Sequence, residues 1–562
     1  MKPRLSIPIL FLLLAPLFVL SQKKAGLKKI QTALRAHVGY LADDKLEGRR
    51  TGTAGEKLAM EYIAQQFQAM GLEAKGTEKY YQPFSVNEGK EMKEATALTI
   101  TKSFSEGAAA TKTLIINKEF FAFPYSANGS VTGTATTGLR EIGSPWLMDI
   151  DVVLEDNASN PHFDLAGYIY EYSKTAKSKG ATALLWYNAG KKEDKLSFNG
   201  KDKSPALDIP VLYMSSPIIN GVTKEDEEGV FNFNGTVQLD EKMRSGSNVI
   251  GWVDNKAATT VIIGAHFDHL GYGEDGNSRY EKKEAAIHNG ADDNASGTAA
   301  LIELARVLKQ SAAKTNNYLF IAFSGEELGL YGSKYFTDHP TLELGSVNYM
   351  INMDMVGRLN DSTRAITIGG YGTSPTWASL VNNQLLSRNE KSLSIKIDSS
   401  GSGPSDHTSF YRKDIPVLFY FTGLHTDYHK PSDDADRINY KGMVQILKHV
   451  YTVVEGANEK GRLAFLKTRE AQTTTTARFS VSMGIMPDYT YSGNGVRADG
   501  VSEGRAAQKA GLKAGDIVLQ IGDYRISSME SYMQTLGRFK KGDKTTVLYQ
   551  RGTEQFTVGI QF

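Results

Sequence analysis

Histidine and acidic side chains gather in five short segments between residues 266 and 429. These segments read HFDH, GADDN, GEEL, NMD and LHTDYH, and six of the ten histidines lie in or near them. The six are His266, His269, His288, His407, His425 and His429. The chain contains no cysteine, so a metal site would be built from imidazole and carboxylate groups. Such groups suit zinc, and also manganese or cobalt.

A pair of divalent cations would give these side chains one shared role. Two ions about 3.5 to 4 Å apart share a bridging carboxylate and a water whose pKa falls far below its value in bulk solvent. The site also needs one carboxylate that binds no metal and accepts the proton of that water. The adjacent pair Glu326 and Glu327 fits this division, because one can bind metal while the other acts as general base.

Four apolar runs lead to most of these side chains. The runs are TTVIIGA, NYLFIAFS, SVNYMINMD and IPVLFYFTG, and each reads as a buried strand. The residues at or after their ends are, in order, His266 and Asp268, Glu326 and Glu327, Asp354, and His425 and His429. Strands and helices alternate from about 246 to 460, which predicts a mostly parallel α/β sheet. Open sheets of this class bind ligands outside the carboxyl ends of their strands, so we expect these residues to converge.

Each residue also has a purely local interpretation. A single His or Asp at a strand end often only holds a loop through hydrogen bonds, and GEELG also reads as an exposed turn. Asp292, Asp293 or Asn294 fits the position of a cap for the helix predicted in TAALIELARVL. The metal interpretation therefore depends on the conjunction of all the segments at one sheet.

Composition limits the classes of protein that the chain can represent. At 562 residues it is too long for a single core, and roughly three or four domains are expected. Apolar residues make up 41% and charged residues 23%, which excludes a mostly disordered or fibrous chain. The net charge of +1 gives no electrostatic reason to expect nucleic acid as a partner.

The first 21 residues have the pattern of a secretory signal peptide. Lys2 and Arg4 precede an apolar stretch from Ile7 to Leu20, and small or polar residues follow. The stretch is short for a membrane-spanning helix, which needs about 20 apolar residues, so an uncleaved anchor is the less favoured alternative. We expect an exported protein, periplasmic or secreted, without stable membrane insertion after signal removal.

The rest of the chain divides into segments that differ in residue types and in the spacing of their apolar residues. Residues 22–109 form the first part of the α/β domain, with helices over about 27–72. Residues 110–245 read as a β-rich insertion containing VTGTATTG, AGYIYEYS, TALLWYNAG and IPVLYMS. The α/β domain resumes over 246–465, and a polar linker at 466–477 leads to a last domain at 478–562.

The motifs resemble those of metallopeptidase family twenty-eight, the co-catalytic zinc aminopeptidases and their relatives. HFDHLG, NGADDNASG, SGEELGLYGS, NMDMVG and DYHKPSDD occur in the order of that family, and the early segment LADDKLEGRRTGTAGEKLAMEYIAQQF is similar to it as well. The resemblance implies a zinc-peptidase fold, in which a mostly parallel sheet is sandwiched by helices. It also implies two zinc ions per chain and hydrolysis of the N-terminal peptide bond of peptides.

The resemblance assigns roles to individual residues. It makes Glu326 the general base and Asp268 the carboxylate that orients His266, and it favours Asp293 over Asp292 because Asn294 follows Asp293. The implied metal ligands are His266 and Asp354 for one ion, Glu327 and His429 for the other, and Asp293 for both.

Some positions of the implied site are open to alternatives. His425 competes with His429 for the last ligand position, although His429 has the family spacing to Asp433. Asp406 and His407 in GPSDHTSF resemble a segment that lines the substrate side, and they also fit a role in holding a turn. With His425, they are the candidate substrate-binding residues.

Two further segments resemble known domains. LAGYIYEYSKTAKSKGATALLWYNAG, followed by ALDIPVLYMS, is similar to a protease-associated domain, which would cover the cleft or limit which peptides enter, or would serve packing alone. The C-terminal segment, including AAQKAGLKAGDIVLQIGD, resembles a PDZ domain. The backbone N–H groups of Met483, Gly484 and Ile485 are then the candidates for holding the carboxylate of a peptide C-terminus.

Three functional hypotheses follow. The first is an exported zinc aminopeptidase. The second is a carboxypeptidase, dipeptidase or glutaminyl cyclase on the same fold, although a cyclase would use a single zinc and the full ligand set argues against it. The third is a catalytically dead binding protein that uses its PDZ and protease-associated parts, and the presence of Glu326 argues against this hypothesis.

Overall fold

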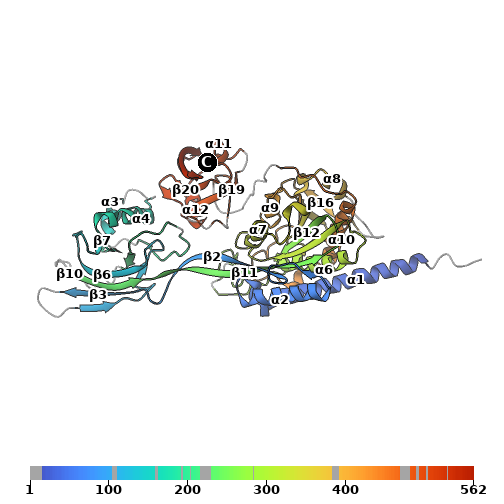
Figure 1. The fold of residues 1–562 in the computed structure, drawn as a ribbon, viewed down its shortest axis with the longest axis horizontal. Coiled ribbons are helices and arrows are strands. Elements are labelled where there is room, and N and C mark those ends of the chain that lie inside the picture. The colour runs from blue at the N-terminus through green and yellow to red at the C-terminus, as the bar shows by residue number, and fades with distance from the viewer. Residues whose placement is uncertain are drawn as a thin grey trace, which may run out of the picture. The chain divides into compact units, whose positions relative to one another are not determined.

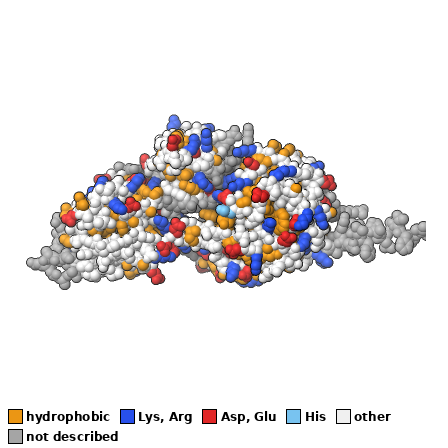
Figure 2. Space-filling model, viewed as in Figure 1, with side chains coloured by type: hydrophobic (Ala, Val, Ile, Leu, Met, Phe, Trp, Pro, Cys, Tyr) orange, Lys and Arg blue, Asp and Glu red, His pale blue; other side chains and the backbone are white. Residues whose placement is uncertain are grey.

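The structure is a computed structural model of the whole chain. It describes residues 15–562 except 104–109, 158–162, 191–193, 203, 216–229, 281, 283, 383–390, 469–480, 489–490, 492, 502–503 and 528. The chain forms two compact units, which we call unit 1 (Met1–Ser85 and Ser245–Thr473) and unit 2 (Val86–Arg244 and Thr474–Phe562). On the face shown in Figure 2, basic and acidic side chains are interspersed, in keeping with the net charge of +1.

Unit 1 is built on a nine-stranded sheet of order β1-β11-β13-β12-β14-β17-β15-β16, with β2 paired to β11 (Figure 1). Its strands are β1 (Glu73–Ala74), β2 (Tyr81–Met92), β11 (Leu239–Val253), β12 (Thr259–His266), β13 (Asn316–Phe323), β14 (Val347–Met353), β15 (Ala365–Gly369), β16 (Ser394–Ile397) and β17 (Val417–Phe421). The four central strands, β13, β12, β14 and β17, are parallel, as predicted. Antiparallel pairings flank them on both sides, β11 with β13 and β15 with β17.

Helices cover both faces of this sheet. The α-helices of unit 1 are α1 (Ala15–Leu41), α2 (Ala54–Ala69), α6 (Gly297–Lys309), α7 (Tyr331–Asp338), α8 (Trp377–Leu380), α9 (His407–Tyr411) and α10 (Tyr440–Asn458). Its shorter helical turns are η1 (Asp44–Arg49), η3 (Ala291–Ser296), η4 (Leu344–Ser346), η5 (Tyr371–Thr373) and η6 (Ala435–Arg437). Alternate residues of β12 face opposite layers: Ile263 packs with α6 and α10, and Ile262 packs with α7 and α9.

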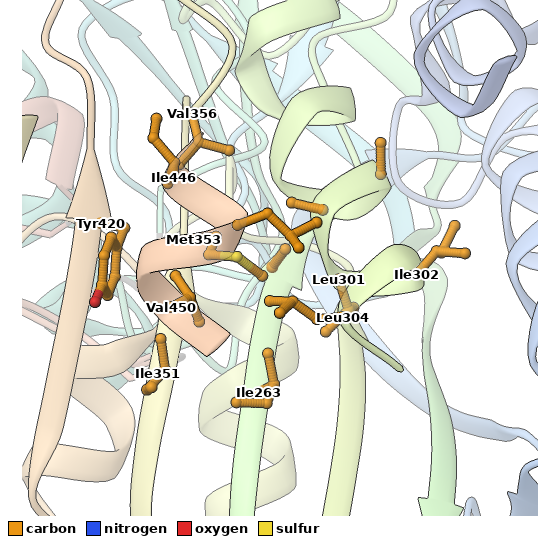
Figure 3. Packing of buried hydrophobic residues seen from close by; sticks show 14 of the residues in the cluster. Ile263, Leu301, Ile302, Leu304, Ile351, Met353, Val356, Tyr420, Ile446 and Val450 are labelled. Carbon is orange, nitrogen blue, oxygen red and sulfur yellow. The ribbon is translucent and has the colours of Figure 1, made fainter. Parts of the chain in front are cut away.

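The larger core of unit 1 lies between the sheet and α6 and α10. Figure 3 shows Leu301 and Leu304 of α6 beside Ile263 of β12, with Val450 of α10 close by. All four side chains are fully buried. Removing this much apolar surface from water stabilises the packing of these helices against the sheet, and so fixes the strands whose ends carry the acidic residues.

The helix α2 follows the predicted pattern closely. It begins after Thr53, whose side chain accepts a hydrogen bond from the backbone N–H of Glu56, and it buries Ile63 and Phe67. The chain turns at Gly71, whose φ of +71° favours glycine.

The inserted part of unit 2 contains two four-stranded sheets. One comprises β4 (Ala110–Thr113), β3 (Ala97–Ser103), β10 (Val230–Val237) and β6 (Gly129–Thr136), and the other β5 (Phe120–Ala122), β9 (Val211–Met214), β8 (Leu184–Tyr187) and β7 (Trp146–Asp149). Its helices are α3 (Asp151–Asp156), α4 (Leu165–Ala176) and η2 (Lys177–Lys179). Because β3 pairs with β10 and precedes residue 110, the predicted boundary at 110 falls inside this sheet.

One predicted strand of the insertion is wrong. AGYIYEYS is rich in aromatic and branched residues, but it lies in the helix α4. Asp164 caps this helix by accepting a hydrogen bond from the N–H of Gly167. Ile169 and Ser173 are buried with Tyr170 on one face, so helical spacing prevails over the strand preference of the residue types.

The C-terminal part of unit 2 has its own sheet and core. Its elements are β18 (Ile485–Pro487), β19 (Val496–Val501), α11 (Ala506–Lys509), β20 (Ile517–Ile521), β21 (Tyr524–Arg525), α12 (Met529–Leu536), β22 (Lys544–Arg551) and β23 (Glu554–Gln561). Met483, Val518 and Val547 are fully buried in the core.

The predicted signal peptide and linker lie largely outside the described residues, which begin at Ala15 and omit 469–480. Within the described part of the chain, we find no helix with the length and apolar character needed to cross a membrane.

Candidate metal centre

The parallel strands bring the acidic residues to one edge of the sheet. His266 is the last residue of β12, Asp354 directly follows β14, and Glu326 comes soon after the end of β13. The loop before α6 supplies Asp293. Ligand atoms of His266, Asp293 and Asp354 all lie within 4.8 Å of one another.

His266 occupies the centre of the first group. Its Nε2 lies 3.2 Å from Oδ1 of Asp354 and 3.4 Å from Oδ1 of Asp293. Burial opposes the charge on the imidazole, but Asp354 and Glu326 outweigh it and hold the pKa of His266 well above its usual value. A cation would fit among these three donors.

The second oxygen of Asp293 faces a second group of donors. His429 Nε2 lies 3.3 Å from Oδ2 of Asp293 and 3.3 Å from Oε2 of Glu327. The other ring nitrogen of His429 bonds to the backbone oxygen of Asn277 at 2.8 Å, which fixes the ring. In the described part of the chain, Nε2 has no hydrogen-bond partner although it is buried. Asp293 therefore lies between two sets of potential ligands.

The loop that carries Asp293 is held by side chains from both neighbouring segments. The Oδ2 of Asp433 accepts hydrogen bonds from the backbone N–H groups of Asp292 and Asp293, at 2.9 and 3.0 Å. Asn294 donates to the backbone oxygen of Met353 and accepts from the N–H of Gly297, the first residue of α6. These bonds join Asp293 to the exit of β14 and to the segment after His429.

Asp268 is buried next to His266 and the glutamate pair. Its carboxylate is 3.7 Å from Nδ1 of His266, whereas its backbone oxygen is 3.2 Å from the same atom. The carboxylate accepts hydrogen bonds from the N–H groups of Glu326 and Glu327, at 3.2 and 3.4 Å. The carboxylate thus holds the backbone of the glutamate pair, whereas the close contact with the ring of His266 is made by the backbone oxygen of Asp268.

Glu326 lies beside the first group without belonging to it. Its Oε2 is 4.0 Å from Nε2 of His266. Burial raises the pKa of Glu326 well above its usual range, and Asp354 and Glu327 add to this effect against the opposing influence of His266. A buried carboxylate with a raised pKa is suited to accept a proton near neutral pH.

The composition of the site fits divalent cations. The side chains of Asp293, Glu327 and Asp354 are at most 13% exposed, and ligand atoms of Asp293 lie within 4.8 Å of those of Asp354 in one group and of Glu327 in the other. Burying several carboxylates together is costly unless cations compensate their charge. Two carboxylates and one imidazole around each position form a donor set that zinc accepts.

Residues 248–454 match the model of peptidase family M28. This M28 segment contains all of the residues to which a metal or proton-transfer role was assigned. A second segment, residues 481–561, matches the model of the PDZ domain.

The chain is also similar to named relatives. Aminopeptidase YwaD of Bacillus subtilis (strain 168) is 28% identical over 290 residues, which cover 49% of this chain and 57% of that protein. The probable leucine aminopeptidase of Arthroderma otae is 28% identical over 212 residues, covering 36% of this chain and 55% of that protein. The solved structure of BSAP, a zinc aminopeptidase from Bacillus subtilis, is 22% identical with a TM-score of 0.40, covering 78% of this chain and 96% of that one. The chain spans between 39% and 66% of the length of the first curated relatives it matches.

His269 of the M28 segment lies close to the proposed ligands, although no role was assigned to it from the sequence. The Nδ1 of His269 lies 2.8 Å from Oε1 of Glu327 and 3.9 Å from Oδ2 of Asp293. Ligand atoms of these three residues also lie within 4.8 Å of one another. The spacing of His269 from His266, three residues beyond the strand end, is the only sequence signal for it.

Tyr428 is a second residue that sequence reasoning missed. Its ring stacks on His429 with centroids 3.9 Å apart. Burial raises the pKa of Tyr428, and the nearby charges of Asp293 and Glu327 raise it further. The hydroxyl therefore lies within the electrostatic influence of the acidic centre.

The structure places His425 beside Asp292 rather than beside Asp293. Its Nε2 lies 3.2 Å from Oδ2 of Asp292, whose Oδ1 accepts hydrogen bonds from Ser296 and the N–H of Gly357. The two adjacent aspartates thus face different histidines, with Asp293 next to His429.

Asp406 and His407, at the start of α9, differ from each other. Burial raises the pKa of Asp406 to about 7. The charge of His266 opposes this increase, and the charge of Asp268 adds to it. The ring of His407 stacks on Phe419 at 4.4 Å, and burial lowers the pKa of His407 to about 3. His407 is thus neutral at physiological pH and packs against the sheet.

The three predicted carboxylate-binding positions of the PDZ segment lie at the start of its sheet. The backbone oxygen of Met483 accepts a hydrogen bond from the N–H of Ala507, and the N–H of Gly484 donates to Oγ of Ser482 at 3.1 Å. Ile485 begins β18 and pairs with Val501 of β19.

Proposed function

We propose that the chain is an exported zinc aminopeptidase that binds two zinc ions through the M28 segment. The observation that carries this proposal is the placement of Asp293. Its Oδ1 faces His266 and its Oδ2 faces His429, at 3.4 and 3.3 Å. One carboxylate that serves two donor groups is the arrangement required by a pair of bridged cations.

The proposed ligands divide into two sets. His266 and Asp354 would hold one ion, Glu327 and His429 the other, and Asp293 both. When bound, zinc would polarise the scissile carbonyl and lower the pKa of the attacking water. Manganese or cobalt would suit the same donors.

The protein's own groups would then move the proton and stabilise charge. Glu326 would accept a proton from the attacking water and pass it to the leaving amine. Tyr428 would donate a hydrogen bond to the carbonyl oxygen as it gains negative charge. Asp268 would keep Glu326 in place through the backbone N–H bond at 3.2 Å.

Cleavage at the amino terminus is supported by the names of the relatives, which include aminopeptidases from bacteria and fungi. A free α-amine beside buried carboxylates would also be favoured electrostatically. We further propose that the inserted part, as a protease-associated domain, limits which peptides enter, and that the PDZ segment binds a peptide C-terminus. Export to the periplasm or medium is part of the same proposal.

The test uses the chain without residues 1–21 and an aminoacyl-p-nitroanilide substrate. Hydrolysis should be abolished by a chelator and restored by zinc, with two zinc ions per chain by elemental analysis. Glu326→Gln should lower kcat by about 10²–10⁴-fold with the zinc content unchanged. Glu343→Gln, at an exposed position of unit 1, is the matched control and should leave kcat unchanged.

Other results would favour the alternative functions. A single zinc ion with cyclisation of N-terminal glutamine would indicate a cyclase. Hydrolysis restricted to substrates with a blocked amino terminus would indicate a carboxypeptidase. Two bound zinc ions with no hydrolysis of any peptide would indicate a binding protein.

A further inference from the structure

The segment LEGRRTGTAGE, residues 46–56, takes no part in the proposed reaction, yet it contains a fully buried arginine. The side chain of Arg49 is 0% exposed. A buried guanidinium is costly unless its donors are satisfied, so its partners indicate what it does.

All the hydrogen bonds of Arg49 in the described chain go to backbone carbonyls. Nε donates to the oxygen of Phe267 at 2.8 Å. Nη1 donates to the oxygens of Asn289, at 2.6 Å, and Leu41, and Nη2 donates to the oxygen of Gly290 at 3.0 Å. The planar guanidinium thus joins three segments that are far apart in the sequence, at residues 41, 267 and 289–290.

These carbonyls belong to the segments that carry the proposed ligands. Phe267 lies between His266 and Asp268, and Gly290 begins the turn that leads to Asp293. Leu41 ends α1. Arg49 therefore connects the exit of β12 with the loop of the shared aspartate, and it anchors both to the N-terminal helix.

The charge of Arg49 also suits this position. Burial lowers its pKa to about 10, and the nearby carboxylates of Asp293 and Asp268 oppose that effect. The guanidinium therefore stays cationic at neutral pH and offsets part of the negative charge of the centre.

A neighbour in the same segment contacts the carboxylate that holds the glutamate pair. Thr51 Oγ1 donates to Oδ2 of Asp268 at 3.1 Å. Asp268 in turn accepts from the N–H groups of Glu326 and Glu327. The segment thus contacts the backbone beside His266 and Asp293 through Arg49, and the carboxylate of Asp268 through Thr51.

We propose that Arg49 is a positioning residue that holds His266 and Asp293 in the geometry for binding metal. This inference rests on the proposed function, because it assumes that these two residues bind zinc. Lysine keeps the charge but presents its donors from a single nitrogen, so it cannot hold the same set of carbonyls.

The experiment measures zinc affinity of the metal-free full-length protein by competition with a chromogenic chelator. Arg49→Lys should bind zinc about 10–100-fold more weakly than the unmodified protein, the range found when a group supporting metal ligands is removed. Thr51→Val should weaken binding in the same direction. Arg306→Met, which removes an arginine that pairs with Glu303 on α6, is the matched control and should keep full affinity.

Melting of each metal-free variant separates positioning from folding. Weaker zinc binding by a variant that melts cooperatively supports the proposal. Unchanged affinity of Arg49→Lys overturns it, and so does loss of folding that saturating zinc does not restore. If the unmodified protein binds zinc but hydrolyses no peptide, the proposed function fails while the role of Arg49 is still decided by these affinities.

Discussion

At the scale of single residues, the protons held by the proposed ligands would determine how the site takes up zinc. Burial disfavours the charged imidazole, but Glu327 and Asp293 outweigh it and raise the pKa of His429 to about 11. Burial alone would raise the pKa of Glu327, but His429 outweighs it and lowers that pKa to about 2. At neutral pH the metal-free pair is therefore a protonated imidazole beside an ionised carboxylate.

Zinc uptake should consequently release protons. A histidine must be neutral to bind metal. In the metal-free protein the pKa of His429 is raised to about 11, and that of His266 is raised well above its usual value. We expect about one to two protons to be released per pair of ions at pH 7, and an apparent affinity that rises with pH. Calorimetric titration in buffers of different ionisation enthalpy measures this number, and uptake without proton release would contradict the assignment of both histidines.

The same shift affects the metal-free fold. The pKa of His429 is higher in the folded than in the unfolded state, so its stabilising contribution is present below about 6.5. It is lost as the pH rises toward about 11, the folded value.

The hydroxyl of Tyr428 can be tested separately from the metal ligands. Tyr428→Phe keeps the ring that stacks on His429 and removes only the hydrogen-bond donor. We expect kcat to fall by about 10²–10³-fold, the cost of losing one donor to a developing oxyanion, with zinc content unchanged. Tyr272→Phe is the control, because the exposed hydroxyl of Tyr272 donates only to the side chain of Glu47 among the described contacts. We expect its kcat to equal that of the unmodified protein.

The convergence of His266, Glu326 and Asp354 could be predicted because each stands at or near the end of an apolar run. The structure brings them to one edge of the sheet, whereas their roles stay predictions. The contacts of Arg49 could not be predicted, because its partners are backbone carbonyls. Every residue has a backbone carbonyl, so the sequence does not mark which ones accept the bonds. The stacking of Tyr428 likewise depends on a tertiary position that no local pattern specifies.

At the scale of elements, the helix α6 connects the core to the acidic loop. Leu301 is fully buried against the sheet, and Thr298 of the same helix donates to the backbone oxygen of His266 at 2.7 Å. Leu301→Ala should destabilise unit 1 by about 2–5 kcal/mol, because a cavity forms where the side chain packed. Denaturant unfolding measures this loss, and Leu58→Ala, at a position 37% exposed, should cost far less.

The error at α4 has a physical explanation at the same scale. AGYIYEYS contains residue types common in strands, and its helical character appears only when Ile169, Ser173 and Ala176 are seen to share one buried face. The period of burial, rather than the residue types, decides the element. The parallel strands were predicted correctly because their apolar runs are short, and short buried runs are typical of strands rather than helices.

At the scale of the whole molecule, all of the proposed metal ligands lie in unit 1. Zinc should therefore stabilise unit 1 without affecting unit 2, by about 4 kcal/mol when free zinc is 1,000 times its dissociation constant. Calorimetric melting with zinc and with chelator should shift one transition and leave the other in place. An equal shift of both transitions would show that the units unfold together.

The strands β2 and β11 run without interruption from the sheet of unit 1 into the inserted part. Just beyond them, the N–H of Lys93 donates to the backbone oxygen of Gln238 at 3.0 Å, so the chain leaves and returns at neighbouring positions. A tight turn joining these two residues would close the ribbon as an ordinary hairpin. Deleting the intervening segment would therefore leave in place the strands whose ends carry His266 and Asp354.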